Sequence, residues 1–150
     1  MTEPRLGRPR MPLSFAEERV LRALETLPPE YQITMGTRFQ FPSWQPEGFP
    51  ISYEPDFEIT DFEGRRIVVE AKSAASLSLA NLSRFVKISE MIRATGRGFL
   101  LLVWGENHPG FRTSALPEFM TLNIRDVQTD SDVMQAVRSE FASTFRPGDR

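Results

Sequence analysis

The chain has 150 residues, 40% of them apolar and 25% charged, with a formal net charge of −2, values typical of one ordinary globular domain and not of a disordered chain. It has no cysteine, which excludes a disulfide framework, a thiolate metal site and a cysteine nucleophile. His108 is its one histidine, which excludes mechanisms that need two histidines; without a G-x-S-x-G segment, a serine hydrolase built on His108 is not expected.

Residues 1–13 form a basic, proline-rich segment, which we expect to be a flexible arm. No apolar run follows that would serve as the core of a signal peptide, and no segment approaches the length of a membrane span. We therefore expect a cytoplasmic protein with no membrane partner. The acidic net charge counts only weakly against nucleic-acid binding, because a bound metal cation would invert the charge of an acidic site.

A first helix is predicted to begin at Ser14. Ser14 and Glu17 form the S-x-x-E pattern of a capping box, in which each residue satisfies a backbone N–H at the start of the helix. Phe15, Val20 and Leu24 follow at roughly helical spacing and predict an apolar stripe.

Three strands are predicted next, over residues 31–41, 51–60 and 65–72, from their alternating or β-branched character. A proline-rich loop separates the first two strands. Residues 61–64 form the turn between the last two, with Gly64 in the left-handed conformation.

The second half of the chain continues the alternation of helices and strands. A helix over residues 77–95, capped by Gly96, precedes the apolar segment 98–104, which is typical of a central strand covered on both faces. A loop, a strand at residues 120–124 and a last helix then follow, and we expect that helix to run from Asp130 or Ser131 to about residue 144.

This order of elements predicts an α/β fold with a mixed β-sheet flanked by helices. We expect one domain over residues 14–145, with the arm of residues 1–13 before it and a frayed tail at residues 146–150 after it.

The turn predicts a specific register for the two strands that it joins. If Asp61 lies opposite Arg65 across a three-residue loop, then Asp56 falls opposite Glu70. Strand alternation places Lys72 on the same face as Glu70. The other face then holds the apolar residues, which are Phe57, Ile59, Ile67, Val69 and Ala71.

Two carboxylates on opposed strand positions make an oxygen site of the kind that binds Mg²⁺ or Mn²⁺, and the backbone carbonyl of Ala71 would add a ligand. Such a metal acidifies a bound water and neutralises charge that develops on a phosphate. Lys72 would orient or deprotonate the attacking water, or stabilise the transition state. Asp56, Glu70 and Lys72 are therefore the candidate catalytic residues for hydrolysis of a phosphodiester.

Pro55-Asp56, followed by Glu70-Ala71-Lys72 across a strand–turn–strand, resembles the signature of the PD-(D/E)XK nuclease superfamily, with alanine as X. Ser14-x-x-Glu17 resembles the superfamily's first motif, whose helix glutamate helps bind metal through water. The layout, similar to that of restriction-type and TnsA-like endonucleases, covers roughly residues 14–105.

The resemblance implies a restriction-endonuclease-like core and an endonuclease that hydrolyses DNA with Mg²⁺, for which Mn²⁺ may substitute. It implies metal binding by Glu17, Asp56, Glu70 and the Ala71 carbonyl. A homodimer or a larger complex would fit, because one site cuts one strand.

Other candidates and alternative interpretations stay open. Ser73, Asn81, Arg84 and Lys87 are candidates for contacts with nucleic acid, although a polar helix surface explains the last three slightly better. Glu17 is explained as well by helix capping as by metal binding. The alternative functions are a non-catalytic nuclease fold that binds DNA or regulates a larger complex, and an unrelated α/β interaction domain.

Overall fold

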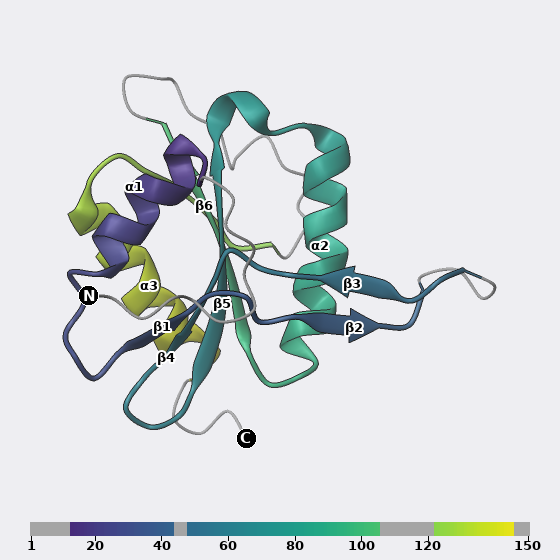
Figure 1. Cartoon of the computed structure of the whole chain (residues 1–150), viewed down its shortest axis with the longest axis horizontal. Helices are drawn as coiled ribbons and strands as arrows, with labels where there is room; N and C mark the ends of the chain where they lie inside the picture. The colour runs from purple at the N-terminus through teal and green to yellow at the C-terminus, as the bar shows by residue number, and fades with distance from the viewer. Residues whose placement is uncertain (1–12, 44–47, 106–121, 146–150) are drawn as a thin grey trace.

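The computed structural model describes residues 13–43, 48–105 and 122–145 (Figure 1). The elements in chain order are α1 (Phe15–Leu24), β1 (Gln32–Thr34), β2 (Phe39–Phe41), β3 (Ile51–Tyr53), β4 (Phe57–Thr60), β5 (Arg66–Ser73), the 3₁₀ turn η1 (Ala74–Ser76), α2 (Leu79–Arg93), β6 (Gly98–Trp104), β7 (Ile124–Val127) and α3 (Asp130–Thr144). The predicted arm, apart from Leu13, and the predicted tail lie outside the described residues.

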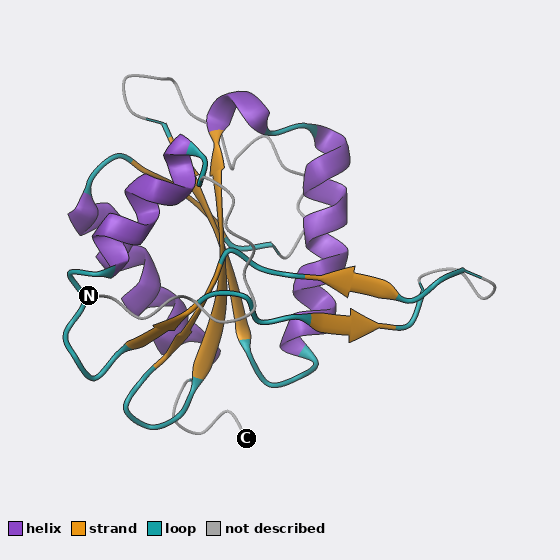
Figure 2. Cartoon of the chain, viewed as in Figure 1, coloured by secondary structure: helices purple, strands orange, loops and turns teal. Residues whose placement is uncertain are grey.

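A mixed five-stranded sheet with the order β1-β4-β5-β6-β7 forms the centre of the domain. Strands β1, β4 and β5 are antiparallel neighbours, whereas β5, β6 and β7 are parallel. Helices α1 and α3 cover one face, and α2 covers the other together with a separate β2–β3 ribbon (Figures 1 and 2). The prediction of an α/β fold with a mixed sheet flanked by helices is confirmed. Within the described residues, no helix combines the length and the apolar character that crossing a bilayer requires.

The start of α1 confirms the capping box predicted from the sequence. The Ser14 Oγ accepts a hydrogen bond from the Glu17 N–H at 3.1 Å, and the Glu17 Oε1 accepts one from the Ser14 N–H at 2.8 Å. Phe15, however, does not belong to the apolar stripe, because 64% of its surface is exposed. The buried face begins one residue later, at Ala16, and continues through Val20 at helical spacing.

The prediction of single strands over residues 31–41 and 51–60 is wrong. Gly36, with a φ of +87°, lies between β1 and β2, and the chain then leaves the main sheet to form the β2–β3 ribbon. Residues 54–56 separate β3 from β4. Pro55 has no N–H to give to a ladder, so a regular strand cannot continue through it.

The predicted register of β4 and β5 is confirmed. Phe57 pairs with Val69 and Thr60 pairs with Arg66. Asp61 donates its N–H to the Arg65 carbonyl at 2.9 Å across the turn, and Gly64 adopts a φ of +80°. The apolar face of this hairpin is buried against α1 and α3, as expected from the sequence; it comprises Phe57, Ile59, Ile67, Val69 and Ala71.

Strand β6 is buried along its whole length, as predicted, between the two helical layers. The strand predicted at residues 120–124 is displaced: β7 begins only at Ile124, where it pairs with Leu101 of β6. Leu122 is buried but precedes the ladder. The loop predicted between these strands lies outside the described residues. Helix α3 begins at Asp130, as expected, and its N-cap is Thr129.

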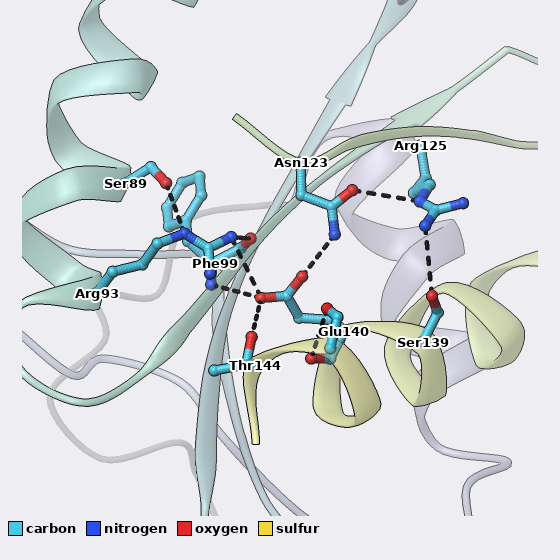
Figure 3. A network of polar contacts seen from close by, with 9 residues as sticks. Ser89, Arg93, Phe99, Asn123, Arg125, Ser139, Glu140 and Thr144 are labelled. Carbon is cyan, nitrogen blue, oxygen red and sulfur yellow. Dashed lines mark hydrogen bonds and ion pairs between the residues drawn. The ribbon is translucent and has the colours of Figure 1, made fainter. Parts of the chain in front are cut away.

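A buried carboxylate ties α3 to the start of β6 (Figure 3). Glu140 is 1% exposed and accepts hydrogen bonds from the Phe99 N–H at 3.1 Å and the Thr144 hydroxyl at 2.7 Å. It also accepts one from the Asn123 amide, and the Arg93 guanidinium lies 3.4 Å away as its counter-charge. These contacts join α2, β6, the start of β7 and α3 around one charged group.

Candidate active site

The two candidate carboxylates lie side by side where β4 begins beside β5. The register carried one step beyond Phe57 and Val69 places Asp56 opposite Glu70. Both are buried, with exposures of 7% for Asp56 and 4% for Glu70. Asp56 is held by the backbone of the neighbouring strand, because its Oδ2 accepts the Ala71 N–H at 2.8 Å.

Pro55 explains why the Ala71 N–H is bonded to a side chain and not to the backbone of the neighbouring strand. In this register the next pair after Asp56 and Glu70 is Pro55 and Ala71. A regular antiparallel pair of this kind exchanges two N–H···O bonds. Pro55 has no N–H and cannot supply one of these two bonds, so the Ala71 carbonyl lacks that ladder donor. The Ala71 N–H is donated to the Asp56 carboxylate instead. Pro55 thus removes the ladder donor that another residue at this position would offer to the Ala71 carbonyl.

Tyr53 is a residue of this site that the sequence reasoning missed. It lies at the end of β3, is 3% exposed, and donates its phenol O–H to the Glu70 Oε1 at 2.7 Å. A single strand over residues 51–60 would place Tyr53 and Asp56 on opposite faces. The break at Pro55 removes that restriction, and the pairing of β3 with β2 directs Tyr53 toward α2 and β6. A break predicted at that proline is the signal that would have found it.

Lys72 lies on the Glu70 side of the sheet, as strand alternation predicts. Its ammonium group is close enough to lower the pKa of Glu70 by electrostatic attraction. The Lys72 Nζ also lies 5.8 Å from the centre of the Phe85 ring of α2, and the residue is half-buried. The cation is therefore fixed beside the carboxylates rather than extended into water.

Glu17 reaches the same site from the opposite helical layer. The N-terminal turn of α1 lies beside the end of β5, and Glu17 and Lys72 line one cavity. The Glu17 carboxyl is in hydrogen-bonding contact with Asp56 and contributes to its raised pKa. Glu17 therefore caps its helix and also contacts the carboxylate pair, so the two interpretations of this residue are compatible.

The pKa values of both carboxyl groups are shifted upward by their surroundings. Burial, together with the nearby Glu70 and Glu17, raises the pKa of Asp56 to about 10. Burial also raises the pKa of Glu70, although Tyr53 and Lys72 act against that shift. Two buried carboxylates in contact are not both ionised without compensation, so in the metal-free protein Asp56 holds a proton at neutral pH.

The oxygen atoms at this site are of the type that binds a small divalent cation. Mg²⁺ is usually held by one or two carboxylates and completes its coordination with water and substrate phosphate. Asp56 and Glu70 supply two carboxylates, and the Ala71 carbonyl lies on the same strand edge. Among the described residues, no group of three or more His, Cys, Asp and Glu side chains is arranged as a ready-made metal cage. Glu17 is thus better placed to act through water than as a direct ligand.

The four candidates for nucleic-acid contacts are placed unequally. Ser73 follows Lys72 at the end of β5, where its hydroxyl donates to the Ser76 hydroxyl at 3.0 Å. Burial and the nearby Glu70 raise the pKa of the Tyr53 phenol, and Arg84, although exposed, lies close enough to act against that shift. Asn81 lies in the first turn of α2, where its side-chain amide donates a hydrogen bond to the Ser76 carbonyl at 3.2 Å.

Lys87 is exposed on α2, one helical turn beyond Arg84 and farther along the helix from η1. The structure therefore brings Ser73 and Arg84 to the edge of the carboxylate site, and it gives Asn81 a local structural contact.

Comparisons of this chain with protein-family models, with curated proteins and with solved structures found no match. The chemistry of the site therefore has to be argued from its own residues. Those residues are two buried carboxylates in contact, a third carboxylate beside them, a fixed ammonium group and a strand carbonyl, all at one end of β5.

Proposed function

We propose that this chain is a metal-dependent endonuclease that hydrolyses DNA phosphodiester bonds on a restriction-endonuclease-like core. The observation that carries the proposal is the contact between the buried carboxyl groups of Asp56 and Glu70, with Lys72 on the same side. Burial raises the pKa of both carboxyl groups, and Glu70 raises that of Asp56 further through charge repulsion; a bound cation would offset this repulsion. DNA is proposed as substrate from the resemblance of the Pro-Asp and Glu-Ala-Lys segments to the PD-(D/E)XK signature.

Each residue has a separate role in this proposal. Asp56 and Glu70 would hold the cation, together with the Ala71 carbonyl, and Glu17, which contacts Asp56, would act on the cation through a water bound to it. A bound Mg²⁺ or Mn²⁺ supplies an acidified water and neutralises charge on the phosphate. Lys72 lies beside Glu70 and would stabilise the negative charge that develops on the phosphate oxygens. Tyr53 holds the Glu70 carboxylate in one orientation through its 2.7 Å hydrogen bond.

Incubation of the purified chain with supercoiled plasmid and with a single-stranded circle, each in Mg²⁺, Mn²⁺ or EDTA, tests the proposal. We expect metal-dependent cleavage that Lys72→Ala and Glu70→Gln each abolish. The matched controls are Arg66→Ala, an exposed cation at the other end of β5, and Glu63→Gln, an exposed carboxylate in the turn. Normal cleavage by Glu70→Gln would refute the assignment of the site.

The lack of a ready-made cage of three side chains among the described residues favours a second candidate function, a non-catalytic nuclease fold that binds DNA or regulates a larger complex. Calorimetric titration with Mn²⁺ distinguishes the two candidates. Binding that Asp56→Ala abolishes supports the nuclease. No binding, and no cleavage of either DNA form, would support the non-catalytic role.

A further inference from the structure

The first residue of α1 places an exposed aromatic ring beside the candidate active site. Phe15 is 64% exposed, and the buried face of its helix begins with its neighbour Ala16. Phe15 therefore contributes little to the core. It lines a cavity that it shares with two residues of the candidate active site, Glu17 and Lys72.

That cavity lies between the start of α1 and the end of β5. Its volume is about 350 Å³, within the range of small-ligand pockets. The helix contributes Phe15, Ala16 and Glu17, and the strand with η1 contributes Lys72, Ser73 and Ser76. Because Lys72 also lies close to Glu70, a group bound in the cavity would lie beside the proposed metal site.

The lining groups match the parts of a nucleotide. Phe15 offers an aromatic face, on which any base can stack, since every base has a π-face. Ser73 donates its hydroxyl to the Ser76 hydroxyl at 3.0 Å, and Ser76 donates its own to the Ser73 carbonyl, so both oxygens offer lone pairs that accept hydrogen bonds from a sugar or a base edge. Lys72 offers a cation for a phosphate. Ala16 and Ala71, with their small side chains, leave the space between these groups open.

We propose that this cavity binds one unpaired nucleotide next to the scissile phosphate, with its base stacked on Phe15. This inference rests on the proposed nuclease function and gives it a substrate class. A base inside an uninterrupted duplex is already stacked on both sides and must be extruded before an aromatic side chain can take it. The preferred substrate is therefore a single strand, or a duplex with an unpaired nucleotide at the cut, and stacking makes the preference independent of base identity.

The test compares four full-length proteins: wild type, Phe15→Ala, Phe15→Trp and Phe62→Ala. Phe62 is the matched control, because it is 69% exposed and lies in the β4–β5 turn at the opposite end of β5. Fluorescence anisotropy in Ca²⁺ measures the Kd for a labelled oligothymidylate of about 12 nucleotides, a length within the usual site sizes for single strands, and for a blunt hairpin duplex. Gel analysis of the same samples confirms that the DNA is intact, and thermal melting confirms that all four proteins are folded.

We expect Phe15→Ala to weaken single-strand binding by about 10- to 100-fold, the usual effect of removing one base-stacking ring. Duplex binding should change by no more than about twofold, as is usual for a surface substitution. Phe15→Trp should retain single-strand binding, and Phe62→Ala should behave as wild type. Equal effects of Phe15→Ala and Phe62→Ala, or equal losses on single strand and duplex, would overturn the proposal.

A parallel incubation of wild type and Lys72→Ala with both DNAs in Mg²⁺ separates this inference from the proposed function. Lys72-dependent cleavage without any effect of Phe15→Ala on binding would overturn the cavity proposal and leave the nuclease proposal standing. Single-strand binding that depends on Phe15, without cleavage by wild type, would support the cavity proposal and count against hydrolysis.

Discussion

The phenol of Tyr53 donates a 2.7 Å hydrogen bond to the Oε1 of Glu70, although the two residues belong to different sheets. Both side chains are buried, so the bond fixes the orientation of a carboxylate that is proposed to hold a metal. Groups that orient a metal ligand in this way contribute to affinity almost as strongly as the ligands themselves.

Replacement of Tyr53 by phenylalanine removes this hydrogen bond and keeps the ring. We expect the Kd for Mn²⁺, measured by calorimetry, to rise by about 10-fold or more, and the free energy of unfolding in EDTA to fall by about 1 kcal/mol. Tyr31→Phe is the matched control, because Tyr31 is the chain's other tyrosine and packs against Phe141 in the other layer. Equal Mn²⁺ affinities in the two variants would show that Tyr53 does not orient Glu70.

The raised pKa of Asp56, about 10, predicts a pH-dependent stability in the metal-free protein. The unfolded chain releases this proton near pH 4, whereas the folded chain keeps it, so the folded state binds more protons between about pH 4 and pH 10 and its stability falls as pH rises through that window. Asp56→Asn mimics the protonated carboxyl and removes this loss.

In EDTA at pH 8, we therefore expect Asp56→Asn to melt about 3–10 °C above wild type, which corresponds to roughly 1–3 kcal/mol for a domain of this size. The difference should shrink toward pH 4. Glu63→Gln, at an exposed carboxylate, should show no such trend. Melting curves measured across this pH range would contradict the prediction if Asp56→Asn were the less stable protein at pH 8.

Pro55 is expected to favour metal binding because it has no N–H. In Pro55→Ala, the new N–H can complete the ladder pair with Ala71 and occupy its carbonyl. We expect hydrogen exchange to show a protected amide at position 55, and calorimetry to show Mn²⁺ binding weakened by about 10-fold. Pro29→Ala, at an exposed proline after α1, is the control. A protected amide with unchanged Mn²⁺ affinity would exclude the Ala71 carbonyl as a ligand.

The start of β6 has no room for a side chain. A Cβ at Gly98 would lie 2.5 Å from the Glu140 Oε2 and 2.8 Å from the Thr144 hydroxyl, so Gly98→Ala must displace a buried carboxylate from its partners. We expect it to cost about 3 kcal/mol in urea unfolding.

Gly96→Ala is the comparison for this clash. It meets no neighbouring atom but has a φ of +88°, so its expected cost, from backbone strain alone, is about 1 kcal/mol. If Gly98→Ala were no more harmful than Gly96→Ala, the packing around Glu140 would be looser than the structure describes.

The register that joins Asp56 to Glu70 was predictable from the sequence, because a short turn with Gly64 and an alternating apolar face both specify it. Capping of the first helix by Ser14 was also predictable, because it depends on two residues only three positions apart. The departure of the chain at Gly36 and Pro55 into a second ribbon was not recognised. Alternation along one strand does not say which neighbour that strand will pair with, and this choice brings Tyr53 to Glu70.

The β2–β3 ribbon packs on the domain through side chains and not through the strand ladder. Phe39 lies under the Arg97 guanidinium, 5.0 Å from its ring centre, and Tyr53 packs against Phe99 with ring centres 6.4 Å apart. The ribbon is not hydrogen-bonded into the five-stranded sheet, so it can lift away by local opening while the core stays folded. Such an opening would withdraw the phenol from Glu70. The hydrogen bond between Tyr53 and Glu70 thus lasts only as long as the ribbon stays packed on the domain. Its lifetime can be shorter than that of the folded core.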